Sequence, residues 1–211
     1  MSNTAFIGFD FETGGTDYLV NPALTAYFCA LDKDLNILGE LSLKIRPSAP
    51  YDKIEQAALD VNKIDLKAHL EDPETLSREE AGKKLQEFLQ KFGGKGPRDK
   101  NRPKPLGHNV GFDMDFLTQL ISGEVINKHF HYSQICTKVV ADFLKLCGLL
   151  PPEIGTLQSL VKHFNIPQKT AHEAKGDTLM MVGVLYTMIK MIKSLKESSG
   201  LSVDILSMLE K

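Results

Sequence analysis

The first apolar run of the chain ends in two carboxylates, and this combination constrains the fold more than any other feature. Residues 6–11 read Phe-Ile-Gly-Phe-Asp-Phe, a pattern typical of a buried strand. Glu12 follows, so Asp10 and Glu12 are two residues apart and point to the same face of that strand. Two anions this close repel each other unless a cation lies between them. The pattern therefore predicts either a strand that ends in solvent or a site for a hard divalent cation.

Two further acids are expected in the first turns of helices. Asp113 follows a short strand that we expect to end near His108, and it lies where the next helix begins. Asp177 lies one turn into a long helix, about 7.5 Å along the axis from His172 at the helix entrance. The helix dipole alone favours acids at such positions. An acid on a core-facing stripe, as Asp177 is, nevertheless needs a partner.

The remaining patterns predict three strands followed by helices mixed with two short strands. Residues 23–31 and 37–45 are strand candidates joined by a hairpin turn. Ser77 and Glu80 form a capping box at the start of a helix that ends at Gly93. A long helix begins near Glu173, and a last short helix is expected over 201–209. This order indicates an α/β fold in which a mixed sheet is covered by helices.

Composition is that of an ordinary globular protein. The chain has 211 residues, of which 42% are hydrophobic and 25% charged, and its net charge is −2. This charge argues against a protein that coats DNA non-specifically. The cysteines number three and form no C-x-x-C pair, so we expect them to be reduced and the protein to be cytoplasmic. No signal peptide and no apolar stretch long enough to span a bilayer are evident.

The order of the acidic motifs is more specific than any one of them. Asp-x-Glu stands on the first strand, an Asp at a mid-chain helix start, and His-x4-Asp near the C-terminal end. This order resembles the DEDDh group of DnaQ-like 3′–5′ exonucleases, which includes epsilon-type proofreading exonucleases, RNase T and oligoribonuclease. The resemblance runs from Phe6 to about Met188 and is most specific at 9–14, 108–117 and 171–177. A stand-alone bacterial or phage-type member is expected.

The resemblance implies an RNase H-like fold, with a five-stranded mixed sheet whose second strand is antiparallel to the rest. It also implies that Asp10, Glu12, Asp113 and Asp177 bind two divalent cations, Mg²⁺ or Mn²⁺. Such a pair of ions suits in-line displacement at phosphorus. His172 is then the expected general base, since its unperturbed pKa near 6.5 suits that role. The expected products are nucleoside 5′-monophosphates.

Four more residues are expected to contact substrate. Thr13 and Gly14 form a tight turn where a ligand can approach the backbone. The family often has a bulky apolar residue just after this turn, whereas Gly14 is followed here by Gly15. Phe112 belongs to the second motif. Asn109 either contacts substrate or caps the next helix, and capping is the favoured interpretation.

A basic loop over 95–104 carries five basic residues and one acid, a net charge of +4. We expect Arg98, Lys100 and Arg102 to hold the substrate backbone, with an affinity that falls as salt rises. The alternative is a solvated insertion, because charge runs in loops are commonplace.

The expected organisation is an exonuclease domain over 1–195 and a C-terminal helical extension over 196–211. The expected partner is the 3′ end of a single strand, with DNA favoured over RNA, and a polymerase or replication protein is a further candidate. A monomer or homodimer without membrane attachment is expected. Two other functions stay open: a non-catalytic module that binds nucleic acid or a polymerase, and a metal-dependent endonuclease or phosphodiesterase.

Overall fold

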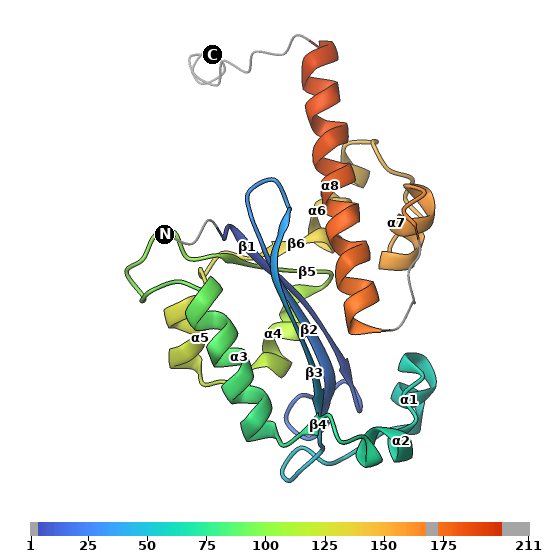
Figure 1. Cartoon of the computed structure of the whole chain (residues 1–211). Coiled ribbons are helices and arrows are strands. Elements are labelled where there is room, and N and C mark those ends of the chain that lie inside the picture. Colours follow the sequence, from blue (N-terminus) through green and yellow to red (C-terminus); the bar gives the residue numbers. More distant parts are fainter. Residues whose placement is uncertain (1–3, 168–172, 200–211) are drawn as a thin grey trace.

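A mixed sheet forms the centre of the computed structural model, which describes residues 4–167 and 173–199 (Figure 1). The strand order is β4-β3-β2-β1-β5-β6. β2 is antiparallel to both of its neighbours, and the other adjacent pairs are parallel. The predicted α/β class and the predicted direction of the second strand are therefore confirmed. The strands are β1 (Phe6–Thr13), β2 (Ala23–Leu31), β3 (Ile37–Ile45), β4 (Thr75–Leu76), β5 (Lys104–Gly107) and β6 (Ile135–Cys136).

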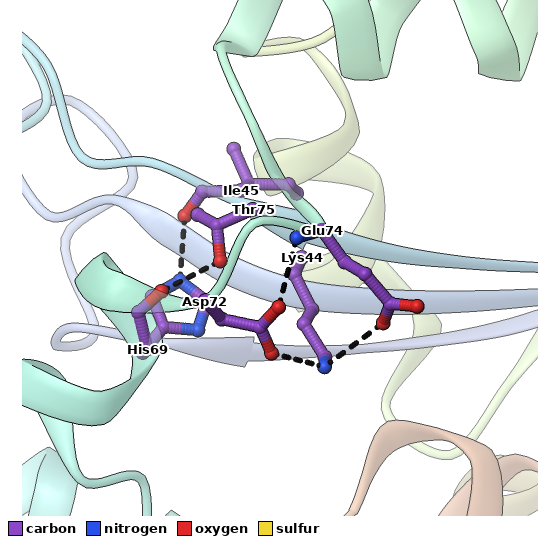
Figure 2. A network of polar contacts seen from close by, with 6 residues as sticks. All are labelled: Lys44, Ile45, His69, Asp72, Glu74 and Thr75. Atoms are coloured by element: carbon purple, nitrogen blue, oxygen red, sulfur yellow. Dashed lines mark hydrogen bonds and ion pairs between the residues drawn. The ribbon is translucent and has the colours of Figure 1, made fainter.

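The sheet has six strands instead of the five expected, because a two-residue strand joins its edge. β4 pairs with the end of β3 through Thr75 and Leu76. Figure 2 shows the polar contacts that hold it there: the Lys44 ammonium donates to Asp72 at 2.6 Å and to Glu74 at 3.2 Å. His69 Nε2 lies 2.9 Å from the Ile45 carbonyl, and the Thr75 hydroxyl donates to the His69 carbonyl at 2.6 Å.

Helices cover both faces of the sheet (Figure 1). On one face, α3, α4 and α5 pack over the aromatic side chains of the central strands; on the other, α6, α7 and α8 pack over Tyr27, Cys29 and Leu31. The shorter α1 and α2 lie near the β4 end. The helices are α1 (Gln56–Asn62), α2 (Leu66–Glu71), α3 (Arg78–Phe92), α4 (Val110–Leu117), α5 (Gly123–His129), α6 (Thr137–Leu146), α7 (Leu157–His163) and α8 (Ala174–Ser199).

The alternation along β1 separates the acids from the aromatic core. Phe9 and Phe11 are buried on the α3–α4 face, so Asp10 and Glu12 project toward the α8 face. Gly8 leaves room for the Cys29 side chain on β2, while Met181 of α8 lies at ordinary contact distance. A Cβ there would lie 3.1 Å from the Cys29 sulfur and 3.5 Å from the Met181 methyl group.

Local sequence signals account for the best-defined helix. α3 begins with the predicted capping box, in which the Ser77 hydroxyl accepts from the Glu80 N–H and the Glu80 carboxylate accepts from the Ser77 N–H. The helix ends at Gly93, whose N–H donates to the Leu89 carbonyl. Both predicted ends of this helix are confirmed.

α8 is longer and more apolar than we expected of any segment of this chain. By length and composition alone, residues 174–198 suffice to cross a bilayer, so the statement that no stretch is long enough is wrong. The buried side chains of this helix, including Met181, Val184 and Met188, pack against the sheet as those of a core helix do.

α8 also runs without interruption across residues 195 and 196, where the domain boundary was expected. The helix expected over 201–209 lies outside the described residues.

Candidate metal centre

Three carboxylates converge at the junction of β1 and α8. Asp10 and Glu12 are half-buried on β1, and Asp177 is buried in the first turn of α8. One oxygen from each lies within 4.8 Å of the others. The strand supplies two of them because alternate residues share a face, and the helix supplies the third because its first turn lies over that face. An all-oxygen set of this kind fits a hard divalent cation.

A fourth carboxylate is anchored beside them by the backbone of β1. Asp113 lies in the first turn of α4 and is only 2% exposed. Its Oδ1 accepts a hydrogen bond from the Phe11 N–H at 3.1 Å. β5 pairs with β1 only as far as Gly8, so further along the strand this side chain takes the place of a neighbouring strand as the acceptor. Asp113 is thereby held next to the segment that carries Asp10 and Glu12.

Without a cation, Asp10, Glu12 and Asp113 keep their protons to higher pH than ordinary carboxyl groups do. Burial raises the pKa of Asp10 well above its ordinary value, and the charges of Asp113, Glu12 and Asp177 raise it further. Burial and then Asp177 raise the pKa of Glu12 to about 8. For Asp113, burial outweighs the Phe11 hydrogen bond and raises the pKa to about 8. Groups that repel one another in this way are stabilised in the charged form by a bound divalent cation.

A cleft of about 310 Å³ opens on the α6–α7 side of Asp10 and Asp177. His108 lines it, with Nδ1 2.9 Å from the Thr137 hydroxyl. Burial, followed by the charge of Lys138, lowers the pKa of His108 to about 4, so this imidazole is neutral near pH 7. The rest of the lining consists of Asn109, Lys138, Gly155, Thr156, Leu157 and Gln158.

A second cleft, of about 560 Å³, opens on the Glu12 side, across β2 and β3. Three lysines line it, and two of them are held by acids. Lys44 is bound to Asp72 and Glu74, and Lys175 lies 3.1 Å from Glu40. The third, Lys63, is exposed and donates to the Asp60 carbonyl. The other polar side chains in the lining are Thr25, Tyr27, Ser42, Asn62 and Glu173.

The turn after β1 uses its backbone groups internally. The Gly14 N–H donates to the Pro22 carbonyl at 2.8 Å, and the Gly14 carbonyl accepts from Glu55. The Thr13 carbonyl accepts from the buried Asn62 amide at 3.0 Å. These bonds hold the turn beside α1, and they leave the Gly14 N–H engaged within the protein.

Asn109 and Phe112 lie at the start of α4. Asn109 occupies the N-cap position, but its side chain makes no capping hydrogen bond, so the favoured capping role is wrong. Its backbone is left-handed, with φ of 68°, whereas capping side chains require an extended N-cap residue. The exposed side chain instead lines the 310 Å³ cleft. Phe112 is half-buried against Phe116, with ring centroids 4.8 Å apart.

The basic loop is not brought to the carboxylates. Lys104, at its end, pairs with Phe6 at the start of β1. Asp10 is four residues further along the strand, about 13 Å at about 3.3 Å per residue. Arg98 and Lys100 belong to the loop that leads into Lys104, so the loop enters the sheet at the opposite end of β1 from Glu12.

His172, the expected general base, lies outside the described residues. The residue that follows it, Glu173, lines the 560 Å³ cleft. Sequence reasoning did not identify the lysines of the two clefts. Lys138 follows the N-terminal residue of α6 and had no signal in the sequence. Lys175 lies inside the third motif, so its proximity to His172 and Asp177 in the sequence was its signal.

Comparison with known proteins adds evidence on the fold. No family model matches the chain, and no curated protein matches it. Among solved structures, E. coli exonuclease I in complex with a dT13 oligonucleotide gives a TM-score of 0.70 at 17% identity, over 92% of this chain and 43% of that chain. The zinc-bound E. coli exonuclease I–ssDNA complex gives 0.69 at 16% identity, over 88% and 40%. Cell-death related nuclease 4 (CRN-4) gives 0.66 at 14% identity, over 90% and 64%.

The chain thus spans less than half the length of the exonuclease I structures it matches. At these identities the similarity establishes the fold, and the predicted RNase H-like α/β architecture is confirmed. Activity has to be argued from the site itself.

Proposed function

We propose that this chain is a metal-dependent 3′–5′ exonuclease of the DEDDh type that acts on single-stranded nucleic acid, with DNA favoured and RNA as the alternative. The convergence of Asp10, Glu12 and Asp177 within 4.8 Å, with Asp113 anchored beside them, is the observation that carries the proposal. The fold shared with exonuclease I, solved in complex with a dT13 oligonucleotide, supports it.

Asp10, Glu12, Asp113 and Asp177 would hold the ions, two in number and either Mg²⁺ or Mn²⁺. When bound, such ions polarise the phosphate and make a water molecule easier to deprotonate. His172 takes the proton from the attacking water as general base. The water oxygen bonds to phosphorus, the bond from phosphorus to the 3′ oxygen of the preceding nucleotide breaks, and that oxygen keeps the electron pair. The product is a nucleoside 5′-monophosphate.

The two clefts would receive the substrate on either side of the carboxylates. Asn109 and Lys138 are both exposed in the 310 Å³ cleft. Asn109 offers an amide and Lys138 a positive charge to the nucleic acid. Phe112 begins the same helix and offers its partly exposed ring. Thr13 and Gly14 would shape the wall beside Glu12, since their backbone groups are bound within the turn.

Digestion of 5′-labelled single-stranded DNA and RNA with Mg²⁺ or Mn²⁺ tests the proposal. We expect a ladder that shortens from the 3′ end, absent with EDTA and absent for Asp10→Ala. Circular strands should resist, because they lack a 3′ end; their cleavage would indicate an endonuclease. Binding of either polymer without cleavage under any metal would contradict the proposal and indicate a non-catalytic module.

A further inference from the structure

The loop between α3 and β5 is folded around its one acid. Asp99 accepts from the Lys95 N–H at 3.0 Å and from the Asn101 N–H at 2.9 Å, and its own N–H donates to the Gly96 carbonyl at 3.0 Å. These bonds lower the pKa of the Asp99 carboxyl, so it is ionised under all ordinary conditions. The negative charge of the loop is thus used to shape its backbone.

One arginine of the loop serves the same internal purpose. Arg102 Nε donates to the Asp99 carbonyl at 3.0 Å, and its guanidinium also donates to the Asn127 carbonyl in the last turn of α5. Lys95, Arg98 and Lys100 are exposed. Among the described residues, no ion pair joins these three to a carboxylate. The folded loop therefore presents three cations to solvent.

An exposed aromatic pair lies at the base of the same loop. The Tyr132 side chain is 85% exposed and is stacked on His131, with ring centroids 4.4 Å apart. The His131 N–H donates to the Pro103 carbonyl at 2.9 Å, which fastens the pair to the base of the loop. A large aromatic ring this exposed gains nothing from burial in the described structure.

The surface of the loop is hollowed in two places. Lys95, Gly96, Pro97, Arg98 and Asp99 line one shallow hollow of about 550 Å³. A second hollow of about 180 Å³ shares Lys95 and Asp99 and extends toward Pro103. Bases that stack on an aromatic ring while cations track the phosphates are the usual features of single-strand binding.

We propose that Lys95, Arg98, Lys100 and the His131–Tyr132 stack form an exosite for single-stranded nucleic acid, separate from the carboxylate centre. The loop joins the sheet where Lys104 pairs with Phe6, at the end marked N in Figure 1. The exosite goes beyond the proposed function, because it binds the part of the strand that lies 5′ of the cleaved end. Arg102 supports the loop and does not contact the strand.

Because the exosite lies away from the carboxylates, a strand must be long enough to bind at both sites. It is at least about 13 Å from Asp10, which is about four nucleotides at about 3.4 Å per nucleotide of one stacked strand. A stacked strand of three nucleotides is shorter than this distance and cannot occupy both sites, whereas a strand of about 20 nucleotides can.

Binding and hydrolysis by the variant Arg98→Ala/Lys100→Ala/Tyr132→Ala test this. The matched control is Lys190→Ala/Lys193→Ala/Tyr186→Ala, which removes two cations and one tyrosine from the exposed face of α8. By fluorescence anisotropy in EDTA, the exosite variant should bind a labelled strand of about 20 nucleotides at least about fivefold more weakly. Its slope of log affinity against log salt should be shallower by about 1.4, for two lost phosphate contacts. The control should match the wild type in both.

Hydrolysis separates this inference from the proposed function. KM for long strands should rise while kcat and KM for a trinucleotide stay unchanged. Tyr132→Phe should retain wild-type affinity, because the ring persists. Unchanged binding of the long strand, or equal losses for short and long strands, would overturn the exosite. The exosite would also be overturned if the variant kept its affinity for the strand but lost affinity for a polyglutamate peptide, because that result would indicate an acidic protein partner. Failure of the wild type to hydrolyse anything would remove the proposed function, and the anisotropy data would still decide the exosite.

Discussion

Asp113 is a carboxylate that the backbone of β1 anchors. It is buried, and the Phe11 N–H holds one of its oxygens to the strand that carries Asp10 and Glu12. Asparagine at this position can still accept that hydrogen bond but has no charge to hold a cation. The role of its charge can therefore be tested without removing its anchor.

We expect Asp113→Asn to lower kcat by roughly 10²- to 10³-fold, the usual cost of removing one preorganised charge or dipole. Its metal-free thermal stability should not fall, since burial already disfavours the charge that the substitution removes. Asp115→Asn is the matched control, because it makes the same change on the exposed side of the same helix. Steady-state kinetics and thermal melts in EDTA measure both. Equal activity of the two variants would remove Asp113 from the centre.

His108 provides a test of the proposed general base. It lines the cleft next to Asp10, but its pKa of about 4 leaves it neutral over the whole neutral range. We expect His108→Gln to leave the acidic limb of the pH profile of kcat in place, and His172→Gln to abolish most of the activity. Measurement of kcat between about pH 5 and pH 9 decides this. Loss of the acidic limb in His108→Gln would transfer the role of base to His108.

At the scale of single residues, the sequence predicts the role of those whose signal lies in neighbouring positions of the chain. Asp10 and Glu12 are visible from a spacing of two, and Asp177 from its place on an apolar stripe. Lys138 and Lys175 are not visible, because each becomes relevant only when α6 or α8 is folded onto β1. The left-handed backbone of Asn109 was likewise unpredictable, since an Asn before a helix ordinarily predicts an extended cap.

At the scale of elements, Arg102 joins the basic loop to α5. Its guanidinium donates to the Asn127 carbonyl, and its side chain lies so close to Gly94 that a Cβ there would be 2.1 Å from it. We expect Arg102→Ala to lower the free energy of unfolding by about 1 kcal/mol through the lost hydrogen bonds. Arg98→Ala, four residues away and exposed, should leave it unchanged. Denaturant titrations compare them. If Arg102→Ala leaves the free energy of unfolding unchanged, the hydrogen bonds of Arg102 contribute nothing to stability.

Elements with local signals were predicted, whereas the edge strand β4 was not. The capping box of α3 and the turn between β2 and β3 are contained in a few consecutive residues. β4 exists only because Thr75 and Leu76 meet the end of β3, about thirty residues earlier in the chain. The two residues of β4 carry too short a pattern to be recognised.

At the scale of the whole molecule, the centre joins β1, α4 and α8, which the sequence separates by many residues. Folding brings together carboxyl groups that repel one another, and their ordinary pKa values of 3.8 and 4.5 rise to about 8 for Asp113 and Glu12. In the unfolded chain these groups ionise above about pH 4.5. The folded protein without metal therefore binds more protons than the unfolded chain between about pH 4.5 and pH 8.

Since raised pKa values stabilise the folded state only while the groups stay protonated, this contribution is complete below the ordinary pKa values and is lost as pH rises through about 8. We expect the melting temperature in EDTA to fall between about pH 5.5 and pH 8.5, and Mg²⁺ or Mn²⁺ to restore it most at the higher pH. Asp10→Asn should melt higher than wild type in EDTA at high pH and respond less to the metal, because it removes a charge that the other three repel. Asp115→Asn should follow the wild type under every condition. A melting temperature that Mg²⁺ and Mn²⁺ leave unchanged at both pH values would mean that the four carboxylates do not hold a divalent cation, and the exonuclease mechanism would fail with them.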